Sequence, residues 1–371
     1  MSGRPGAPRV LHIHGSLAAG DPQANRCARL IEAFGGRLRH AMVAADGDFG
    51  ALAGLSQGLA VERYSGFPRF DGWPVPGRLQ RVARAMSDYH LVLSYGRAGT
   101  GAALAHTMFG ELTGAPPLIH HEDGSDETDA QRRTLRGKWL RRVGLGKAAG
   151  LVVPTETMEG VALSAWQQPM GRVKLIPDGI DAKRFGGKPR SNGIARLLKR
   201  EGELWIGCFA GPGVDEGLTA LLRELPKLDQ AWHLVVVGQG TAVSALEAAA
   251  SRTGLDHRVH LVPTPLDRSE AVALFDILAV PRGREPLPLA VIEAMAAGKP
   301  VVGLSQPEAA ALCPDNADLG TGALERLAAD AYLRQHIGAA NRERALDERS
   351  EAAMIAAYRR LYASAMKRET I

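Results

Sequence analysis

Short apolar runs of about four to six residues, many ending near Gly or Pro, alternate with helical stretches along the whole chain. This alternation is typical of units in which each strand is followed by a helix, and such strands pair in parallel sheets. The pattern therefore predicts an α/β fold built from doubly wound, Rossmann-like domains. The predicted strands are 10–14, 39–44, 91–94, 117–120, 150–153 and 173–176 in the first half, and 204–209, 233–237, 259–262, 277–280 and 300–303 in the second.

The length of 371 residues suits two domains, because a domain typically holds about 150 residues. Residues 182–200 are rich in Gly, Lys and Arg, show little periodicity, and are predicted to link the domains. We therefore expect an N-terminal, acceptor-side domain over 1–181 and a C-terminal, ligand-binding domain over 201–345, facing each other across a cleft. The helical pattern over 346–371 is expected to return to the N-terminal domain.

Composition excludes several classes of protein. Hydrophobic residues make up 45% and charged residues 23%, which is ordinary for a globular chain and argues against disorder. The three cysteines, Cys27, Cys208 and Cys313, lie far apart, so the sequence suggests neither a disulfide framework nor a thiolate zinc site. No apolar run approaches the roughly 18 residues of a membrane span, and the N-terminus lacks the apolar core of a signal peptide. We therefore expect a cytoplasmic protein.

The net charge of +5 arises in the first half, where residues 1–180 hold 21 Lys and Arg against 16 Asp and Glu. Residues 131–147 concentrate this excess, because seven of them are basic and none is acidic. Two interpretations are open: a helix lying on an anionic membrane surface at the inner face of the plasma membrane, or a solvated helix whose apolar stripe faces its own core. Aromatic residues make up only 5% and no nucleic-acid-binding motif occurs, so no nucleic-acid partner is expected.

The most informative segment is 280–302, which reads as strand, loop, helix and strand. Gly298 suits the position just past the helix end, and Pro300 prevents the helix from continuing. Glu285 falls beyond the carboxyl end of a strand, where open parallel sheets bind ligands, and Glu293 follows about two helical turns later. Two carboxylates so placed can accept hydrogen bonds from a sugar and a ribose of one extended ligand.

Glu285 and Glu293 are eight residues apart, and Glu293 opens the run Glu-Ala-Met-Ala-Ala-Gly-Lys-Pro-Val-Val. This pattern resembles the signature of the family-4 retaining glycosyltransferases, which have the GT-B fold. The resemblance covers most of the chain and implies two Rossmann-like domains across a cleft. Further matching segments are 15–23, 118–124, 176–181, 236–240, 341–342 and 358–362.

The resemblance also implies residue roles. Glu285 would contact hydroxyls of the donor sugar, Glu293 those of the ribose, and His120 the transferred sugar from the opposite domain, which makes Glu285 and His120 the catalytic candidates. Attack would come from the front face, with the leaving phosphate oxygen helping to take the acceptor proton. No metal and no cofactor is implied beyond a UDP- or GDP-sugar as co-substrate. Further donor-binding candidates are Gly15 and Ser16 beside the diphosphate, and Gly238, Pro288 and Leu289.

The chain departs from the family where the diphosphate would bind. Gly211 and Glu216 stand where the family has an Arg and a Lys, Asp21 replaces a glycine, and Pro288 removes an amide donor. Because charge develops on a leaving nucleoside diphosphate, other cations are expected to compensate. The candidates are Arg282, Arg284 and, on the acceptor side, Arg97.

Histidines near the predicted cleft allow another interpretation. His12 and His14 alternate on a strand and therefore share a face, which permits a metal site. The sequence favours ordinary strand-end histidines beside a ligand site, and we assign no metal. The acidic run that begins at residue 122 is interpreted as a solvated loop that touches the acceptor. The full metal set would add His120, His121, Glu122 and Asp123, of which Glu122 and Asp123 are also the acceptor-side candidates.

We therefore expect a retaining glycosyltransferase that moves a hexose from a nucleotide diphosphate sugar to a lipid-linked or cell-surface glycan acceptor. Its partners would be the nucleotide sugar, the acceptor and an anionic membrane. The missing Arg and Lys leave an alternative open: a non-catalytic GT-B-like binding or scaffold protein that partners another transferase. A nucleotide-sugar epimerase on the same fold is a third interpretation.

Overall fold

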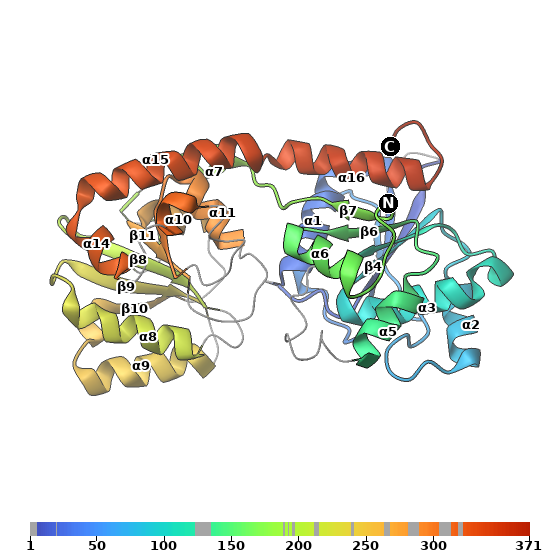
Figure 1. The fold of residues 1–371 in the computed structure, drawn as a ribbon, viewed down its shortest axis with the longest axis horizontal. Coiled ribbons are helices and arrows are strands. Elements are labelled where there is room, and N and C mark those ends of the chain that lie inside the picture. The colour runs from blue at the N-terminus through green and yellow to red at the C-terminus, as the bar shows by residue number, and fades with distance from the viewer. Residues whose placement is uncertain are drawn as a thin grey trace. The chain divides into compact units, whose positions relative to one another are not determined.

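The computed structural model describes most of the chain and divides it into two compact units, Met1–Pro177 with Met354–Ile371, and Asp178–Ala353 (Figure 1). The sequence instead places the first boundary at residue 181 and gives 182–200 to a linker. Each unit is described by itself below. The described residues are 6–19, 21–122, 135–187, 190–191, 193–194, 197–210, 215–238, 241–262, 268–280, 289–303, 313–317 and 322–371.

In the first unit, the described residues form a parallel sheet in the order β3-β2-β1-β4-β5-β6-β7. The register of β1 on β2 runs from Arg9 opposite Arg39 to His14 opposite Ala44. The strand order reverses between β1 and β4, and doubly wound sheets bind ligands at such a reversal. The strands are β1 (Arg9–His14), β2 (Arg39–Ala44), β3 (Val61–Arg63), β4 (Leu91–Tyr95), β5 (Leu118–His121), β6 (Gly150–Val153) and β7 (Val173–Leu175).

Helices cover both faces of this sheet, because successive strand residues point to opposite sides. Leu11 and Ile13 pack with apolar residues of α2, α3 and α6, whereas Val10 packs with those of α1 and α16. The Asp21 carboxylate caps α1 by accepting a hydrogen bond from the Ala24 amide at 2.7 Å, which fixes where this helix begins. The helices are α1 (Pro22–Phe34), η1 (Gly35–Arg37), η2 (Gly50–Leu52), α2 (Pro76–Ala85), α3 (Gly96–Thr113), α5 (Leu135–Gly144), α6 (Glu156–Ser164) and α16 (Glu351–Ala365).

The second unit repeats the parallel, doubly wound design, and its described strands run in the order β10-β9-β8-β11-β12. Its strand order reverses between β8 and β11. The strands are β8 (Leu204–Phe209), β9 (Trp232–Val237), β10 (Val259–Val262), β11 (Ile277–Ala279) and β12 (Val301–Val302). The helices are α7 (Ala182–Phe185), α8 (Asp215–Glu224), η3 (Leu225–Lys227), α9 (Thr241–Thr253), η4 (Asp256–Arg258), α10 (Arg268–Leu274), α11 (Leu289–Ala296), α13 (Pro314–Ala317), α14 (Ala323–Ala329) and α15 (Ala331–Glu348).

The segment predicted as a linker packs instead onto the second unit. Phe185 and Ile194 are buried in its apolar core, and Lys199 donates a hydrogen bond to the Asp276 carboxylate at 2.6 Å. A stretch without periodicity can still be anchored by two apolar side chains and one ion pair.

The C-terminal helix returns to the first unit. Met354, Tyr358 and Tyr362 of α16 are buried against that unit's sheet, and the Tyr362 hydroxyl lies 2.9 Å from His121 Nε2. These contacts explain why 354–371 belong to the first unit although the chain reaches them from the second.

Candidate functional site

The carboxyl ends of β8 and β9 meet closely in the second unit. Gly238 follows β9 with a φ of 152°, and a Cβ built on it would lie 2.7 Å from the Ala210 carbonyl oxygen, just beyond β8. A larger residue would push the two strand ends apart, so Gly238 is required for their close approach. This predicted donor-binding residue therefore shapes the sheet edge where ligands of such folds bind.

Glu293 lies next to this edge and forms an ion pair with Arg268. Its carboxylate, on α11, is only 3% exposed and accepts hydrogen bonds from Arg268 Nε at 2.8 Å and from Arg268 Nη2. The Arg268 guanidinium carbon lies 3.8 Å from the ring centre of Phe209, the last residue of β8. A flat cation is therefore held between an aromatic ring and a buried carboxylate at the carboxyl end of the sheet.

Sequence reasoning missed Arg268, because only the packing of α10 and α11 brings it to Glu293. Arg268 is the first residue of α10, and the positive end of the helix dipole disfavours a cation there. The ion pair with Glu293, which lies 25 residues later in the chain, offsets this unfavourable position.

Only part of the predicted donor-binding set falls within the described residues. Leu289 begins α11, four residues before Glu293, and packs beside the apolar core of the second unit. The structure thus brings Glu293 and Gly238 to one end of the sheet and joins Arg268 to them. Glu285, Arg282, Arg284 and Pro288 lie outside the described residues, as does Gly211.

The first unit contains a cavity of about 700 Å³ at the carboxyl ends of β1 and β4, where the strand order reverses. Gly15 and Ser16, which follow β1, line it together with Arg97 from the first turn of α3. A Cβ on Gly15 would lie 2.9 Å from the Ala98 Cβ, so a glycine lets the β1 loop approach α3. Three residues predicted at separate places in the sequence thus share one cavity.

His120 and Glu122 lie in a buried polar chain beside this cavity. His120 is fully buried, with Nδ1 2.9 Å from the Ser94 hydroxyl and Nε2 3.8 Å from a Glu122 oxygen. Glu122 accepts hydrogen bonds at 2.8 and 3.0 Å from Arg141, which itself lines the cavity. His120 is not among the described residues that line the cavity, and its predicted contact with a sugar stays a prediction. Asp123 lies outside the described residues.

The charge state of Glu122 follows from its surroundings. Burial alone would raise the pKa of this carboxyl, but Arg141 and His120 beside it outweigh burial and lower the pKa to about 2. Glu122 is therefore a carboxylate at neutral pH, and its ion pair with Arg141 neutralises much of that guanidinium's charge.

The described residues of the alternative metal set do not all come together, and Asp123 lies outside the description. His12 and His14 share a face, as predicted, and His121 lies in the same buried ring stack, with its ring centre 4.5 Å from that of Tyr95. His120 points to the opposite face, because adjacent strand residues alternate, and it contacts Ser94 there. His120 and His121 therefore lie on opposite faces of β5, and His120 cannot join the other histidines of the alternative set.

The basic segment 131–147 forms α5 over Leu135–Gly144, and residues 131–134 lie outside the description. Arg141 is buried with Glu122, while Lys147 donates a hydrogen bond to Glu111 at 2.7 Å. Trp139 is 54% exposed and the neighbouring Arg142 is also exposed. Among the helices that the structure describes, none combines the length and apolar character needed to cross a bilayer.

The second unit contains a segment that matches a known protein family. Residues 204–331, from β8 to the start of α15, match the family described as Glycosyl transferases group 1. We refer to residues 204–331 as the group 1 domain, after the family that they match. The group 1 domain contains the Arg268–Glu293 pair and Gly238, and the match confirms the family predicted from the 280–302 segment.

Two curated glycosyltransferases are similar to this chain over part of their lengths. Lipopolysaccharide glucosyltransferase WaaG of Escherichia coli is 30% identical over 165 residues, which cover 42% of this chain and 44% of WaaG. D-inositol 3-phosphate glycosyltransferase of Salinispora tropica is 30% identical over 257 residues, which cover 60% of this chain and 51% of that protein. The chain thus spans about half the length of the curated relatives it matches.

A solved structure is similar over nearly the whole chain. The crystal structure of Anabaena HepE in complex with UDP and glucose matches 96% of this chain and 100% of HepE, with a TM-score of 0.72 and 17% sequence identity. This likeness, together with the two parallel sheets, confirms the predicted GT-B fold around the group 1 domain.

Proposed function

We propose that this protein is a retaining glycosyltransferase that moves a sugar from a nucleotide diphosphate sugar to a lipid-linked or cell-surface glycan acceptor. The observation that carries the proposal is the Arg268–Glu293 pair at the carboxyl end of β8, within a group 1 domain. A guanidinium that donates hydrogen bonds to a carboxylate fixes its orientation, and the carboxylate oxygens can also accept hydrogen bonds from ribose hydroxyls.

The donor is a UDP-sugar in this account. HepE, whose fold the chain shares, was solved with UDP and glucose, and WaaG is by name a glucosyltransferase. Glu285 would bind the sugar hydroxyls, as the resemblance implies. The N-terminal end of the helix predicted after it, with Pro288 and Leu289, would lie against the phosphates.

Arg268 supplies part of the positive charge that the chain lacks at residues 211 and 216. Its Nε and Nη2 donate hydrogen bonds to Glu293, and its Nη1 group is proposed to bind a phosphate oxygen. Stacking on Phe209 holds the guanidinium in place, so little reorganisation is needed when charge develops on the leaving diphosphate. Arg282 and Arg284 remain further candidates for the same task.

The reaction needs few protein groups. The acceptor hydroxyl attacks the anomeric carbon from the face that the diphosphate leaves, the carbon–oxygen bond to the phosphate breaks, and the phosphate oxygen takes the acceptor proton. The protein positions the reactants and stabilises the leaving group. The cavity of the first unit, with Arg97 and Arg141 in its wall, is the proposed place of the acceptor.

The test is mass spectrometry of reactions that contain the full chain, a panel of UDP- and GDP-sugars and a lipid-linked glycan acceptor. We expect sugar transfer to the acceptor, or slow donor hydrolysis without it, with a UDP-sugar. Conversion of the donor to an isomer without acceptor would indicate the epimerase. Absence of binding to every nucleotide would contradict the proposal and favour the scaffold protein.

A further inference from the structure

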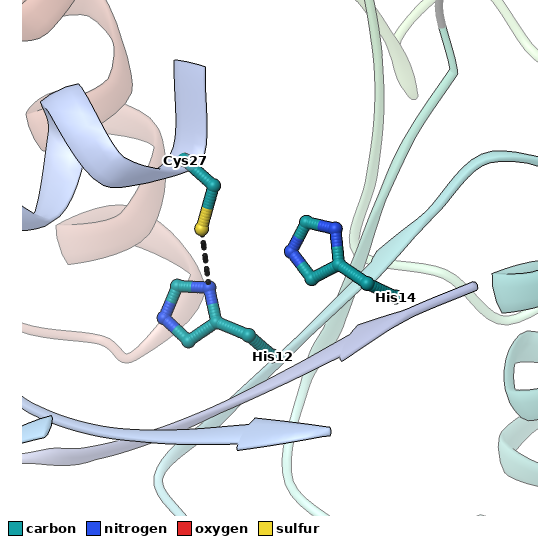
Figure 2. A group of neighbouring side chains, drawn as sticks. All are labelled: His12, His14 and Cys27. Atoms are coloured by element: carbon teal, nitrogen blue, oxygen red, sulfur yellow. Dashed lines mark hydrogen bonds between the residues drawn. The ribbon is translucent and has the colours of Figure 1, made fainter. Parts of the chain in front are cut away.

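A second constellation of side chains lies in the first unit and shares no residue with the donor-binding set named above. His12 and His14 come from alternate positions of β1 and point to the same face, where Cys27 of α1 covers them. All three are buried, and His12 Nδ1 lies 3.3 Å from Cys27 Sγ (Figure 2). One potential ligand atom from each residue lies within 4.8 Å of the other two.

His14 carries an independent sign that something is bound here. Its side chain is about 1% exposed, and its Nε2 has no hydrogen-bond partner among the residues that the structure describes. Figure 2 shows this ring directed toward Cys27 and His12, so its lone pair faces the other two ligand atoms. A buried ring nitrogen without a partner is costly, and such groups in native proteins normally meet a water, an ion or a ligand.

His12 is oriented for the same purpose. Its Nε2 lies 2.9 Å from His40 Nδ1, and its Nδ1 lies 3.0 Å from the Tyr95 hydroxyl. When Nε2 donates its proton to His40, the Nδ1 lone pair is left facing both Tyr95 and Cys27. Metal-binding histidines are typically held in this way by a hydrogen bond from the other ring nitrogen.

We propose that His12, His14 and Cys27 form a binding site for a divalent ion of the zinc class. Two imidazole nitrogens and one sulfur are ligands that zinc and cobalt prefer, whereas calcium and magnesium prefer oxygen. The ion takes the lone pairs of His12 Nδ1 and His14 Nε2, and it displaces the proton of the Cys27 thiol, which leaves to solvent. Ligand atoms around a tetrahedral zinc lie roughly 3.3 to 3.9 Å from one another. The three side chains therefore need to move closer together by about 1 Å to bind the ion.

The fourth position is supplied from the cavity side. Tyr95 and His14 both line the 700 Å³ cavity, so an ion can enter from it. A water molecule from the cavity, or the Tyr95 hydroxyl, then completes four-coordination. The bound ion would tie α1 to β1 directly beside Gly15 and Ser16. Sugar transfer, as proposed above, takes place without this ion.

The experiment is titration of the metal-free, reduced full chain with Co²⁺, followed by absorption spectroscopy. We expect one Co²⁺ per chain, with the visible bands of tetrahedral cobalt and a thiolate-to-cobalt charge-transfer band that Zn²⁺ removes by competition. Cys27→Ser should abolish the charge-transfer band. Cys208→Ser, a change at an equally buried cysteine of the second unit, should leave it intact.

His40 gives a variant outside the ligand set. Loss of a partner behind a ligating histidine typically weakens metal affinity roughly 10- to 100-fold. We expect His40→Phe to lower Co²⁺ affinity by this factor while the charge-transfer band remains at saturation. No cobalt bands in the wild-type chain, or an unchanged charge-transfer band in Cys27→Ser, would overturn the proposal. Circular dichroism shows whether each variant folds. If a variant does not fold, the presence or absence of cobalt bands in the wild-type chain tests the proposed site.

Discussion

Arg268 and Glu293 are joined by three hydrogen bonds although they lie on different helices, α10 and α11. The pair closes the carboxyl end of β8, where Arg268 stacks on Phe209. It places a positive and a negative group at the carboxyl end of the sheet in the group 1 domain, where we propose that the phosphates and the ribose of the donor bind. This relationship links the fold of the second unit to the proposed reaction.

Replacing Arg268 should weaken nucleotide binding. Arg268→Ala removes a cation and leaves the buried Glu293 carboxylate without this partner, so we expect UDP affinity to fall by about 10- to 100-fold, or roughly 1.4 to 2.8 kcal/mol. Arg268→Lys should recover part of it, because lysine keeps the charge but not the planar fork. Isothermal titration calorimetry measures both. Arg252→Ala, a change at an exposed arginine of α9, is the control, and equal affinities in all variants would exclude Arg268 from the site.

Glu285 should be needed for turnover and not for folding. We expect Glu285→Gln to reduce sugar transfer by at least about 100-fold, because a carboxylate that binds donor hydroxyls in the transition state is lost. The free energy of unfolding, measured by thermal denaturation, should change by less than about 0.5 kcal/mol. A variant that keeps wild-type turnover would remove Glu285 from the mechanism.

Elements with a clear pattern in neighbouring residues are predicted correctly from the sequence, whereas elements without such a pattern are not. The strands at 204–209 and 259–262 are found at the predicted residues, because an apolar run bounded by turn residues is a local pattern. The three-residue, partly exposed strand Val61–Arg63 has no such pattern and was not predicted.

Contacts between residues far apart in the chain could not be predicted, because no pattern in neighbouring residues indicates them. The Arg268–Glu293 and Glu122–Arg141 pairs join residues 25 and 19 positions apart, and only the packing of helices on a sheet brings them together. The shared face of His12 and His14 could be predicted from alternation alone. The arrival of Cys27 from α1 could not, because it depends on how that helix packs.

The buried Glu122–Arg141 pair should make stability depend on acid. The pKa of Glu122 falls from its usual 4.5 to about 2 in the folded protein, so the unfolded chain binds more protons. Its contribution is complete above about pH 4.5 and is lost as pH falls toward 2. Denaturant unfolding between pH 7 and pH 3 should show a smaller acid loss in Glu122→Gln than in the wild type. Identical pH profiles would contradict the assignment.

Breaking the same pair at neutral pH should be costly. Arg141→Met leaves Glu122 buried without its guanidinium, and such changes cost about 3 to 5 kcal/mol. The measurement is the free energy of unfolding in urea at pH 7. Arg142→Met, at the neighbouring exposed position, should cost less than about 0.5 kcal/mol. A similar loss in both variants would show that the Glu122 contact contributes little.

Contact with an anionic membrane should depend on α5. Trp139 is exposed beside the basic residues of this helix, and an indole ring suits the headgroup region. We expect Trp139→Ala to reduce sedimentation with vesicles that contain phosphatidylglycerol by a factor of about 3 to 10. Trp73→Ala, at a tryptophan that is 71% exposed elsewhere in the first unit, is the matched control. Equal sedimentation of both variants and the wild type would show that Trp139 of α5 does not contribute to membrane binding.

The central claim is that Glu293, held by Arg268, binds the ribose of a nucleotide diphosphate. Calorimetric titration of the full chain with UDP and with 2′,3′-dideoxy-UDP tests it most directly, in the wild type and in Glu293→Gln. We expect the wild type to bind UDP at least about 10-fold more tightly than the dideoxy analogue, and Glu293→Gln to lose most of this preference. Equal affinity of the wild type for the two nucleotides, or no binding of UDP, would contradict it.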